Sequence, residues 1–163
     1  MKIGVLSDTH LRAPSQLLEV ILDELLGDAD TILHAGDIVA RSVLERLDAH
    51  GVLAVSGNMD DYEVTGAVPQ MRIVEAAGKR IGLIHGWGSR EGLERRIIQR
   101  FQTPLPDVIV YGHSHVPFWG EVEGVRMFNP GAASTGGHGR EGSVGIIEIV
   151  NDKLEGRFLP VTR

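Results

Sequence analysis

The sequence predicts an α/β fold in which a two-layer core of β-sheets is flanked by helices, and three observations support this prediction. Short apolar runs recur up to residue 111, and each is followed within a residue or two by Gly, Asp, Asn or His. Segments with helical spacing separate these runs, and the remainder of the chain has the pattern of β-hairpins. Uninterrupted apolar runs of this length are typical of strands that are buried on both faces, as in sheets covered by helices.

Five buried strands are predicted at residues 3–6, 31–33, 52–55, 81–84 and 108–111. Three helices are expected between them: one after Ser15, which can act as an N-cap, one ending before Gly51, and one after Ser89. The third helix is expected to present Arg95 and Arg96 to solvent. The apolar residues of the three helices repeat at helical intervals, at Leu17, Leu18, Ile21, Leu22 and Leu25, at Val43, Leu44 and Leu47, and at Leu93, Ile97, Ile98 and Phe101.

After Val116 the helical period disappears and two hairpins are predicted. The first joins residues 118–122 to 125–128 through Glu123-Gly124, and the second joins 144–150 to 154–161 through Asn151-Asp152. No repeat, linker or shift in composition divides the chain. A length of 163 residues is also that of one ordinary domain, so we expect a single domain over residues 1–163.

Composition excludes several classes of protein. The formal net charge of −6 argues against a broad nucleic-acid surface, which needs many Lys and Arg contacts to phosphate. The chain has no cysteine, so it offers no disulfide, thiolate nucleophile or Cys-bound metal, which suits a cytoplasmic location. No apolar run approaches the length of a membrane-spanning helix or a secretion signal, so we expect no membrane association.

Side chains that can bind metal ions follow each of the five predicted strands. Because the carboxyl ends of parallel strands meet at one rim of a sheet, we expect these side chains to converge there. Two carboxylates, one amide and four imidazoles can form two adjacent sites that suit Mn, Fe, Ni, Co or Zn better than Ca or Mg. The seven residues are Asp8, His10, Asp37, Asn58, His85, His113 and His115.

Glycine is unusually frequent, at 21 of 163 residues, and four glycines adjoin these candidate ligands. Gly36, Gly57, Gly86 and Gly112 lie where a strand has to turn sharply to direct a ligand to the rim. We therefore expect tight turns, including some with positive φ, at these positions.

The same segments resemble the five ordered blocks of the calcineurin-like metallophosphoesterases, and in particular the small single-domain phosphodiesterases. The blocks are Ser-Asp-Thr-His at 7–10, Gly-Asp at 36–37, Gly-Asn at 57–58, His-Gly at 85–86 and Gly-His-Ser-His at 112–115. Asn129-Pro130-Gly131 and the final strand pair are also similar to that branch, so the resemblance covers nearly the whole chain.

This resemblance implies a four-layer αββα sandwich of two packed mixed sheets flanked by helices. It also implies two divalent ions per chain, manganese first and Ni, Co, Fe or Zn as alternatives. Asp37 would bridge the two ions, and Asn58 would also help to position the phosphoryl oxygens, so these two residues are the predicted catalytic residues. One ion would be held by Asp8, His10 and His115, and the other by Asn58, His85 and His113.

The function that the resemblance implies is hydrolysis of small or activated phosphodiesters by a metal-bound hydroxide. Two alternatives stay open: a scaffold that acts through protein contacts, as the subunit of the retromer complex with this fold does, and a phosphomonoesterase. The filled set of ligand positions favours catalysis. A homodimer is expected only by family resemblance.

Met59 departs from the larger members of the superfamily, which have a histidine after Gly-Asn. A thioether cannot donate a proton, so acid assistance to the leaving group, worth roughly 10²- to 10⁴-fold, is expected to be missing. This position favours diesters with good leaving groups over poor ones.

Three further histidines have other predicted roles. His34 lies within a strand and is expected to form hydrogen bonds near the site, and His50 is expected to interact with the C-terminal end of a helix. For His138 and Arg140, in a glycine-rich stretch, two interpretations stay open: an exposed loop, or a flap that touches the substrate phosphate.

Overall fold

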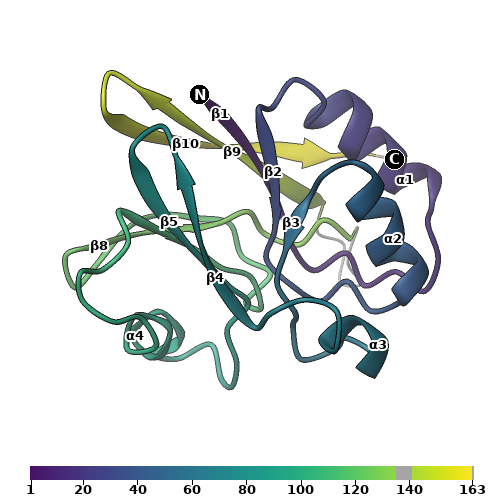
Figure 1. Cartoon of the computed structure of the whole chain (residues 1–163), viewed down its shortest axis with the longest axis horizontal. Helices are drawn as coiled ribbons and strands as arrows, with labels where there is room; N and C mark the ends of the chain where they lie inside the picture. Colours follow the sequence, from purple (N-terminus) through teal and green to yellow (C-terminus); the bar gives the residue numbers. More distant parts are fainter. Residues whose placement is uncertain (135–140, 163) are drawn as a thin grey trace.

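The computed structural model of the chain describes residues 1–134 and 141–162, and within them ten strands form two mixed sheets of five (Figure 1). In spatial order, the first sheet contains β10 (Lys153–Val161), β9 (Gly142–Val150), β1 (Lys2–Leu6), β2 (Thr31–His34) and β3 (Leu53–Ala54). The second contains β4 (Met71–Ala76), β5 (Lys79–Ile84), β6 (Val108–Val110), β8 (Val125–Asn129) and β7 (Phe118–Val122).

The central strands of each sheet are parallel and the outer strands are antiparallel. In the first sheet β1, β2 and β3 run parallel, whereas β9 and β10 form an antiparallel hairpin on the other side of β1. In the second sheet β5, β6 and β8 run parallel, and β4 and β7 are antiparallel edges. The ends of the parallel strands are therefore collected at one rim of each sheet.

Helices cover the outer faces of the two sheets. Helix α1 (Gln16–Glu19), its π-helical continuation η1 (Val20–Leu25) and α2 (Arg41–Ala49) lie beside the first sheet, and α4 (Leu93–Ile98) lies on the opposite side of the molecule (Figure 1). A short helix, α3 (Tyr62–Thr65), follows β3. The layers are thus helix, sheet, sheet and helix, which confirms the predicted αββα sandwich.

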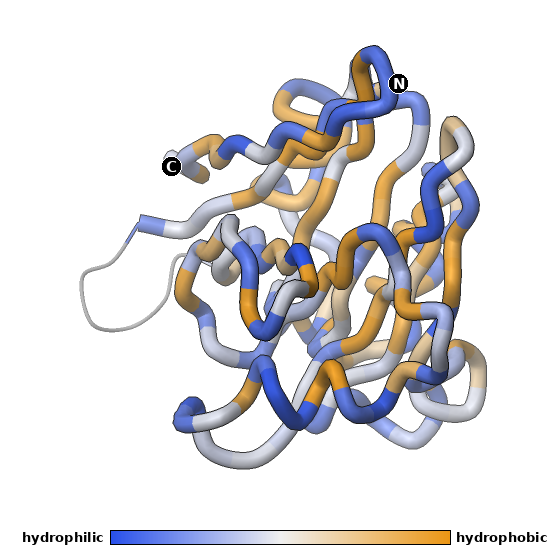
Figure 2. Tube along the Cα trace, turned by 90° about the vertical axis from the view of Figure 1, so that its left-hand side faces the viewer, coloured by the Kyte–Doolittle hydropathy of each residue, from blue (hydrophilic) through white to orange (hydrophobic). Residues whose placement is uncertain are grey.

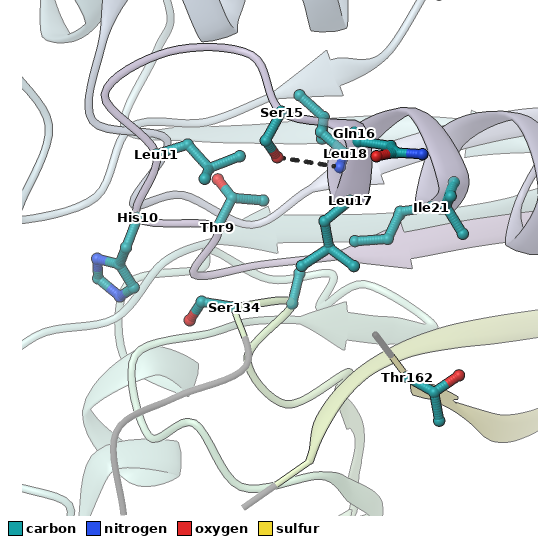
Figure 3. A pocket seen from close by; sticks show the side chains of 12 residues that line it. Thr9, His10, Leu11, Ser15, Gln16, Leu17, Leu18, Ile21, Ser134 and Thr162 are labelled. Atoms are coloured by element: carbon teal, nitrogen blue, oxygen red, sulfur yellow. Dashed lines mark hydrogen bonds between the residues drawn. The ribbon is translucent and has the colours of Figure 1, made fainter.

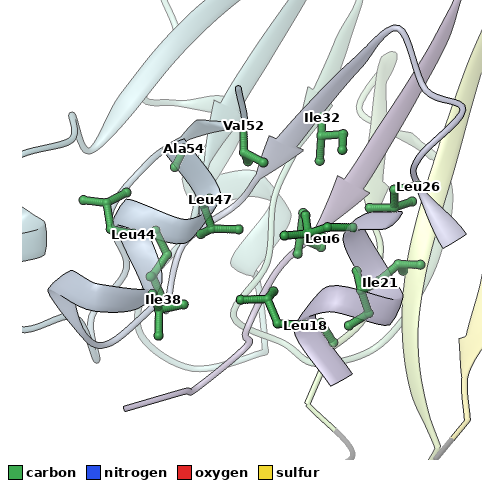
Figure 4. Packing of buried hydrophobic residues seen from close by; sticks show 14 of the residues in the cluster. Leu6, Leu18, Ile21, Leu26, Ile32, Ile38, Leu44, Leu47, Val52 and Ala54 are labelled. Atoms are coloured by element: carbon green, nitrogen blue, oxygen red, sulfur yellow. The ribbon is translucent and has the colours of Figure 1, made fainter. Parts of the chain in front are cut away.

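Three apolar clusters fill the three spaces between these layers. One lies under α1, η1 and α2 and contains Leu6, Leu18 and Leu47 (Figure 4). The second lies between the sheets and contains Val5, Leu83, Val110 and Phe128, and the third lies under α4. Figure 2 shows hydrophobic colour along the central strands and hydrophilic colour at many of the turns between elements.

Successive residues of the central strands face different clusters. In the first sheet Val5 points between the sheets and Leu6 points to the helices. In the second sheet Val110 points between the sheets and Ile109 points to α4. Because both faces of these strands are covered, most positions are apolar or glycine, and the buried polar residue His34 of β2 is hydrogen-bonded. This is the physical reason for the uninterrupted apolar runs in the sequence.

The five predicted buried strands and both predicted hairpins are confirmed, with shifts of one or two residues at their ends. Ser15 is the N-cap of α1, since its hydroxyl accepts a hydrogen bond from the Leu18 amide. Two elements, β4 and α3, were not predicted, and the first predicted helix is divided into α1 and η1. Within the described ranges, no helix is long and apolar enough to cross a membrane.

Candidate metal centre

The seven predicted ligand residues come together at the rim where the parallel strands end. Four of them follow strands of the first sheet: Asp8 and His10 follow β1, Asp37 follows β2, and Asn58 follows β3. The other three follow strands of the second sheet: His85 follows β5, and His113 and His115 follow β6. Each sheet therefore supplies part of the cluster.

Five of these seven residues have a left-handed backbone, which is uncommon for residues other than glycine. The φ angles are 55° at Asp8, 49° at His10, 60° at Asp37, 67° at His113 and 59° at His115. Such conformations cost of order 1–3 kcal/mol each and tend to be concentrated at functional sites. The strand ends are thus held in unfavourable geometry in order to direct these side chains to one place.

The neighbouring glycines serve two different purposes. Gly36 and Gly86 have positive φ, at 93° and 100°, as expected for sharp turns. Gly57 and Gly112 do not, so a positive φ does not explain them. A Cβ at Gly57 would lie 2.2 Å from Asp37 Oδ1, and one at Gly112 would lie 2.0 Å from Ser7 Oγ. These two glycines are required because the loops that carry the carboxylates approach them too closely for any side chain.

One half of the cluster is built around the buried carboxylate of Asp8. Its Oδ2 accepts hydrogen bonds from the Ser7 hydroxyl, at 2.6 Å, and from the His113 amide, at 3.2 Å. Its Oδ1 is buried and has no hydrogen-bond partner among the described residues. This oxygen faces Nε2 of His115 at 3.0 Å and Nε2 of His10 at 3.7 Å, and those two nitrogens are 3.2 Å apart.

The other half brings together groups that are all hydrogen-bond acceptors. Nδ1–H of His85 donates to the Ala35 carbonyl at 2.7 Å, and Nε2–H of His113 donates to the Gly88 carbonyl at 2.7 Å. In the neutral rings, the remaining nitrogens carry lone pairs. These two nitrogens lie 3.1 Å and 3.0 Å from Asn58 Oδ1, so three acceptors meet without a donor between them.

Asp37 lies between the two halves. Its Oδ1 accepts a hydrogen bond from the Met59 amide at 2.8 Å, which fixes the carboxylate. Its Oδ2 lies 3.3 Å from Nε2 of His85 and 3.7 Å from Nε2 of His10. A single oxygen of Asp37 is therefore within reach of both halves.

The electrostatics of the cluster favour positive charge. Burial by itself would raise the pKa of Asp8, but the neighbouring His10, His115 and Ser7 outweigh it, so the pKa lies below its usual value. The pKa of Asp37 is lowered in the same way, with His85 opposing the effect of burial. The pKa of His10 is raised by Asp8, and that of His85 is raised by the two carboxylates despite burial.

The spacing of these atoms fits ligands of a transition-metal ion. Ligands about 2.1 Å from one ion lie about 3.0 Å apart when they are at right angles. The distances in the cluster are 3.0–3.9 Å, and two groups of three, Asp8–His10–His115 and Asp8–Asp37–His85, have all their donor atoms within 4.8 Å of one another. A cation would also give the unpartnered Asp8 oxygen and the converging lone pairs the positive partner that they lack.

Several residues that support the cluster were not singled out as such from the sequence. The buried side chain of Asn129 donates to the Gly112 carbonyl and the Ser114 hydroxyl and so fixes the loop that carries His113 and His115. Arg95 is exposed, as predicted, whereas Arg96 is only partly exposed: its guanidinium donates to the carbonyls of Trp87 and Glu91 and holds the loop that includes Gly88.

Other predicted residues lie as follows. His34 is fully buried and bonded to Gly36 and Thr9 next to the cluster, and His50 bonds the Arg46 carbonyl at the end of α2, as expected for both. Met59 is 57% exposed beside the centre. His138 and Arg140 lie outside the described residues.

Known proteins resemble this chain over nearly its whole length. It is 33% identical to a probable metallophosphoesterase of Methanocaldococcus jannaschii, an alignment that covers 99% of this chain and 82% of the relative. It is 31% identical to a phosphodiesterase of the same organism, over 80% and 83% of the two chains.

Among solved structures, Vps29 of Chaetomium thermophilum superposes with a TM-score of 0.74 at 18% identity, covering 98% of this chain and 93% of Vps29. At that level of identity the likeness concerns the fold alone. The profile of the calcineurin-like phosphoesterase superfamily domain matches residues 1–152. Because this profile covers residues 1–152 and the relatives align over more than four fifths of their own length, the chain belongs to the calcineurin-like phosphoesterase superfamily.

Proposed function

We propose that this protein hydrolyses phosphodiesters at a centre that holds two divalent metal ions. The observation that carries the proposal is the convergence of unpartnered acceptors: the buried Oδ1 of Asp8 on one side, and the lone pairs of His85 and His113 against Asn58 on the other. In this proposal Asp8, His10 and His115 hold one ion. The other is held by Asn58, His85 and His113, and Asp37 bridges the two.

Bound divalent ions would supply Lewis acidity and lower the pKa of a water that attacks the phosphorus. The protein's own groups orient this chemistry. The Met59 amide and the Ala35 and Gly88 carbonyls fix the rotamer of Asp37 and the tautomers of His85 and His113. Asn58 presents Oδ1 to the histidines, and its amide nitrogen donates to a phosphoryl oxygen of the substrate.

A diester rather than a monoester is proposed for two reasons. A relative that is 31% identical is named a phosphodiesterase. The position after Asn58 is Met59, whose thioether cannot protonate a leaving group. The scaffold alternative has a weaker basis, because the likeness to Vps29 concerns the fold alone, whereas all seven predicted ligand positions carry side chains that can bind a metal ion.

The first experiment measures metal content and activity together. The protein is stripped with a chelator, reloaded separately with Mn, Ni, Co, Fe or Zn, and analysed by elemental analysis. We expect two ions per chain and hydrolysis of bis(4-nitrophenyl) phosphate in preference to 4-nitrophenyl phosphate. One ion or none at saturation would contradict the dinuclear centre. Preference for the monoester would favour a phosphomonoesterase, and two bound ions without hydrolysis would favour a scaffold.

The bridging role of Asp37 is tested by comparing Asp37→Ala with His10→Ala. The first substitution removes a ligand from both ions and the second from one, so Asp37→Ala should lose more activity and more bound metal. Asp48→Ala is the matched control, because Asp48 is an exposed carboxylate on α2 outside the cluster. Equal metal content and equal residual rates for Asp37→Ala and His10→Ala would refute the bridging assignment.

Three finer points stay predictions. Manganese as the physiological ion is tested by elemental analysis of protein purified without added metal. A homodimer is tested by sedimentation, and a cytoplasmic location by cell fractionation.

A further inference from the structure

An apolar pocket of about 570 Å³ opens beside the candidate metal centre. It lies between the loop after β1 and the first helical segment, α1 and η1, and Ser134 and Thr162 complete its rim (Figure 3). This volume is within the range of about 300–1,000 Å³ that is typical of small-molecule sites. An engineered apolar cavity of about 150 Å³ already binds benzene, so the pocket has room for an aromatic ring.

The pocket is continuous with the centre because His10 belongs to both. Figure 3 shows His10 at one end of the lining and Leu17 and Ile21 of the helix toward the other. The Nε2 atom of His10 lies 3.7 Å from the Oδ2 atom of Asp37. This pocket would therefore lie next to a phosphoryl group that is bound at the centre.

The walls of the pocket suit an apolar group. Leu11, Leu17, Val20 and Ile21 line it, and Leu11, Leu17 and Val20 are only partly buried, so their side chains keep surface that a ligand can cover. Of the polar residues in the lining, Thr9 and Ser134 lie on the side of His10, and Gln16 and Thr162 lie farther from it (Figure 3). The lining is thus predominantly apolar, with single polar side chains both near the centre and away from it.

The opposite side of the centre has a different chemistry. A second pocket, of about 440 Å³, borders Asn58 and His85 and includes the polar side chains of Thr65, Gln70 and Arg100. The two sides of the centre therefore differ: apolar beside His10, and more polar, with a cation, beside Asn58 and His85.

Local helix geometry adds an independent observation. The helix changes from α to π at Val20, and Val20 and Ile21 line the pocket at this change. π-Helical turns are rare and are found frequently at functional sites, because the wider turn displaces side chains from their regular positions. The helix is therefore distorted at the point where it forms the apolar wall.

We propose that this pocket binds an apolar ester substituent of the phosphodiester substrate, such as an aryl or a short branched alkyl group. The inference rests on the proposed function and narrows it to diesters with one apolar and one more polar substituent. The phosphoryl group would be held at the centre, the apolar substituent beside His10 against Leu17 and Val20, and the polar one toward Arg100.

The test compares two inert probes that carry the same anion. These are the monomethyl esters of phenylphosphonic acid and of methylphosphonic acid, and their dissociation constants are measured by calorimetry with the metal-reloaded protein. We expect the phenyl compound to bind at least about tenfold more tightly, since burying a ring removes a large apolar area from water. Equal affinities would overturn the proposal.

Variants then locate the effect. Val20→Trp fills the pocket and should abolish the preference for the phenyl probe without changing the affinity for the methyl probe, whereas Glu24→Trp, at an exposed position outside the pocket, should change neither. If Val20→Trp does not fold, Leu17→Ser replaces it, with the half-buried Leu25→Ser as control. An unchanged preference for the phenyl probe in the folded pocket variant would refute the assignment.

Failure of this inference can be distinguished from failure of the proposed function. If bis(4-nitrophenyl) phosphate is hydrolysed and both probes bind equally well, the proposed function stands and the pocket assignment is wrong. If neither probe binds and no diester is hydrolysed by the reloaded protein, the proposed function fails and the inference fails with it.

Discussion

Protonation of His34 is predicted to destabilise the protein in mildly acidic solution. This side chain is fully buried in the first sheet. Its Nδ1 accepts a hydrogen bond from the Gly36 amide at 3.1 Å, so in the neutral ring Nε2 carries the proton and lies 3.2 Å from the Thr9 hydroxyl. A proton on Nδ1 would break the bond to Gly36. Burial is the main reason that the pKa of His34 is lowered from 6.5 to about 3.

The size of the expected loss in the free energy of unfolding follows from this difference in the pKa of His34 between the folded and unfolded chain. Between pH 6.5 and about 3, the unfolded chain binds a proton at His34 that the folded chain does not, so the free energy of unfolding falls as the pH falls. At pH 5, about 1.5 units below the unfolded pKa, the loss is about 2 kcal/mol, because each unit is worth about 1.4 kcal/mol. This contribution is fully present above pH 6.5 and is lost progressively below it.

The assay is urea unfolding from about pH 7.5 to pH 5, for the wild type and for His34→Asn. The side-chain oxygen of the introduced asparagine can still accept the bond from the Gly36 amide, because asparagine commonly bonds the amide two residues on. The stability difference between the two proteins should shrink by about 2 kcal/mol as the pH falls over this interval. Parallel profiles for the two proteins would refute the reasoning, and His50→Asn controls for the loss of a histidine elsewhere.

Two further predictions concern the leaving group and the packing of the sheets. Met59→His places a proton donor beside the centre and should flatten the dependence of kcat/KM on leaving-group pKa across aryl and alkyl diesters. Asp60 does not orient the new ring, because its carboxylate already accepts hydrogen bonds from the Val39 and Gly57 amides. An unchanged slope in a folded, metal-loaded variant would contradict it. Gly145→Ala puts a Cβ 2.3 Å from Phe128 Cζ and should cost about 1–3 kcal/mol in urea unfolding, and Phe128→Leu in the same chain should offset part of this cost. Additive losses in the double variant would count against a direct clash.

Most of the fold could be predicted because the central strands are covered on both faces. The run Val108-Ile109-Val110 is apolar at every position, and each side chain has a cluster to enter. Strand β4 was missed because it is an edge strand in which only Ala76 is buried, so Arg72 and Glu75 interrupt its apolar pattern. Helix α3 has four residues, too few for a helical period to be visible.

The candidate ligands could be predicted because each follows a strand within five residues, which places it near the rim where the parallel strands end. The features that hold these ligands in place could not be predicted from the sequence. The carbonyls of Ala35 and Gly88 set the tautomers of His85 and His113, and backbone carbonyls have no sequence signature. The pocket beside His10 also depends on how α1 and η1 pack beside the loop after β1, which no spacing of residues reveals.

The cluster draws Asp8, His10, Asp37 and Asn58 from one sheet and His85, His113 and His115 from the other, so a bound ion would fasten the two sheets together. Loading with metal should therefore raise the melting temperature, because the ligands are brought together only while the two sheets are packed. The reverse also holds. Phe128 of the second sheet packs closely against Gly145 and Gly156 of the first, so a substitution at Phe128 should change the spacing of the sheets and with it the affinity for metal, although no ligand is altered.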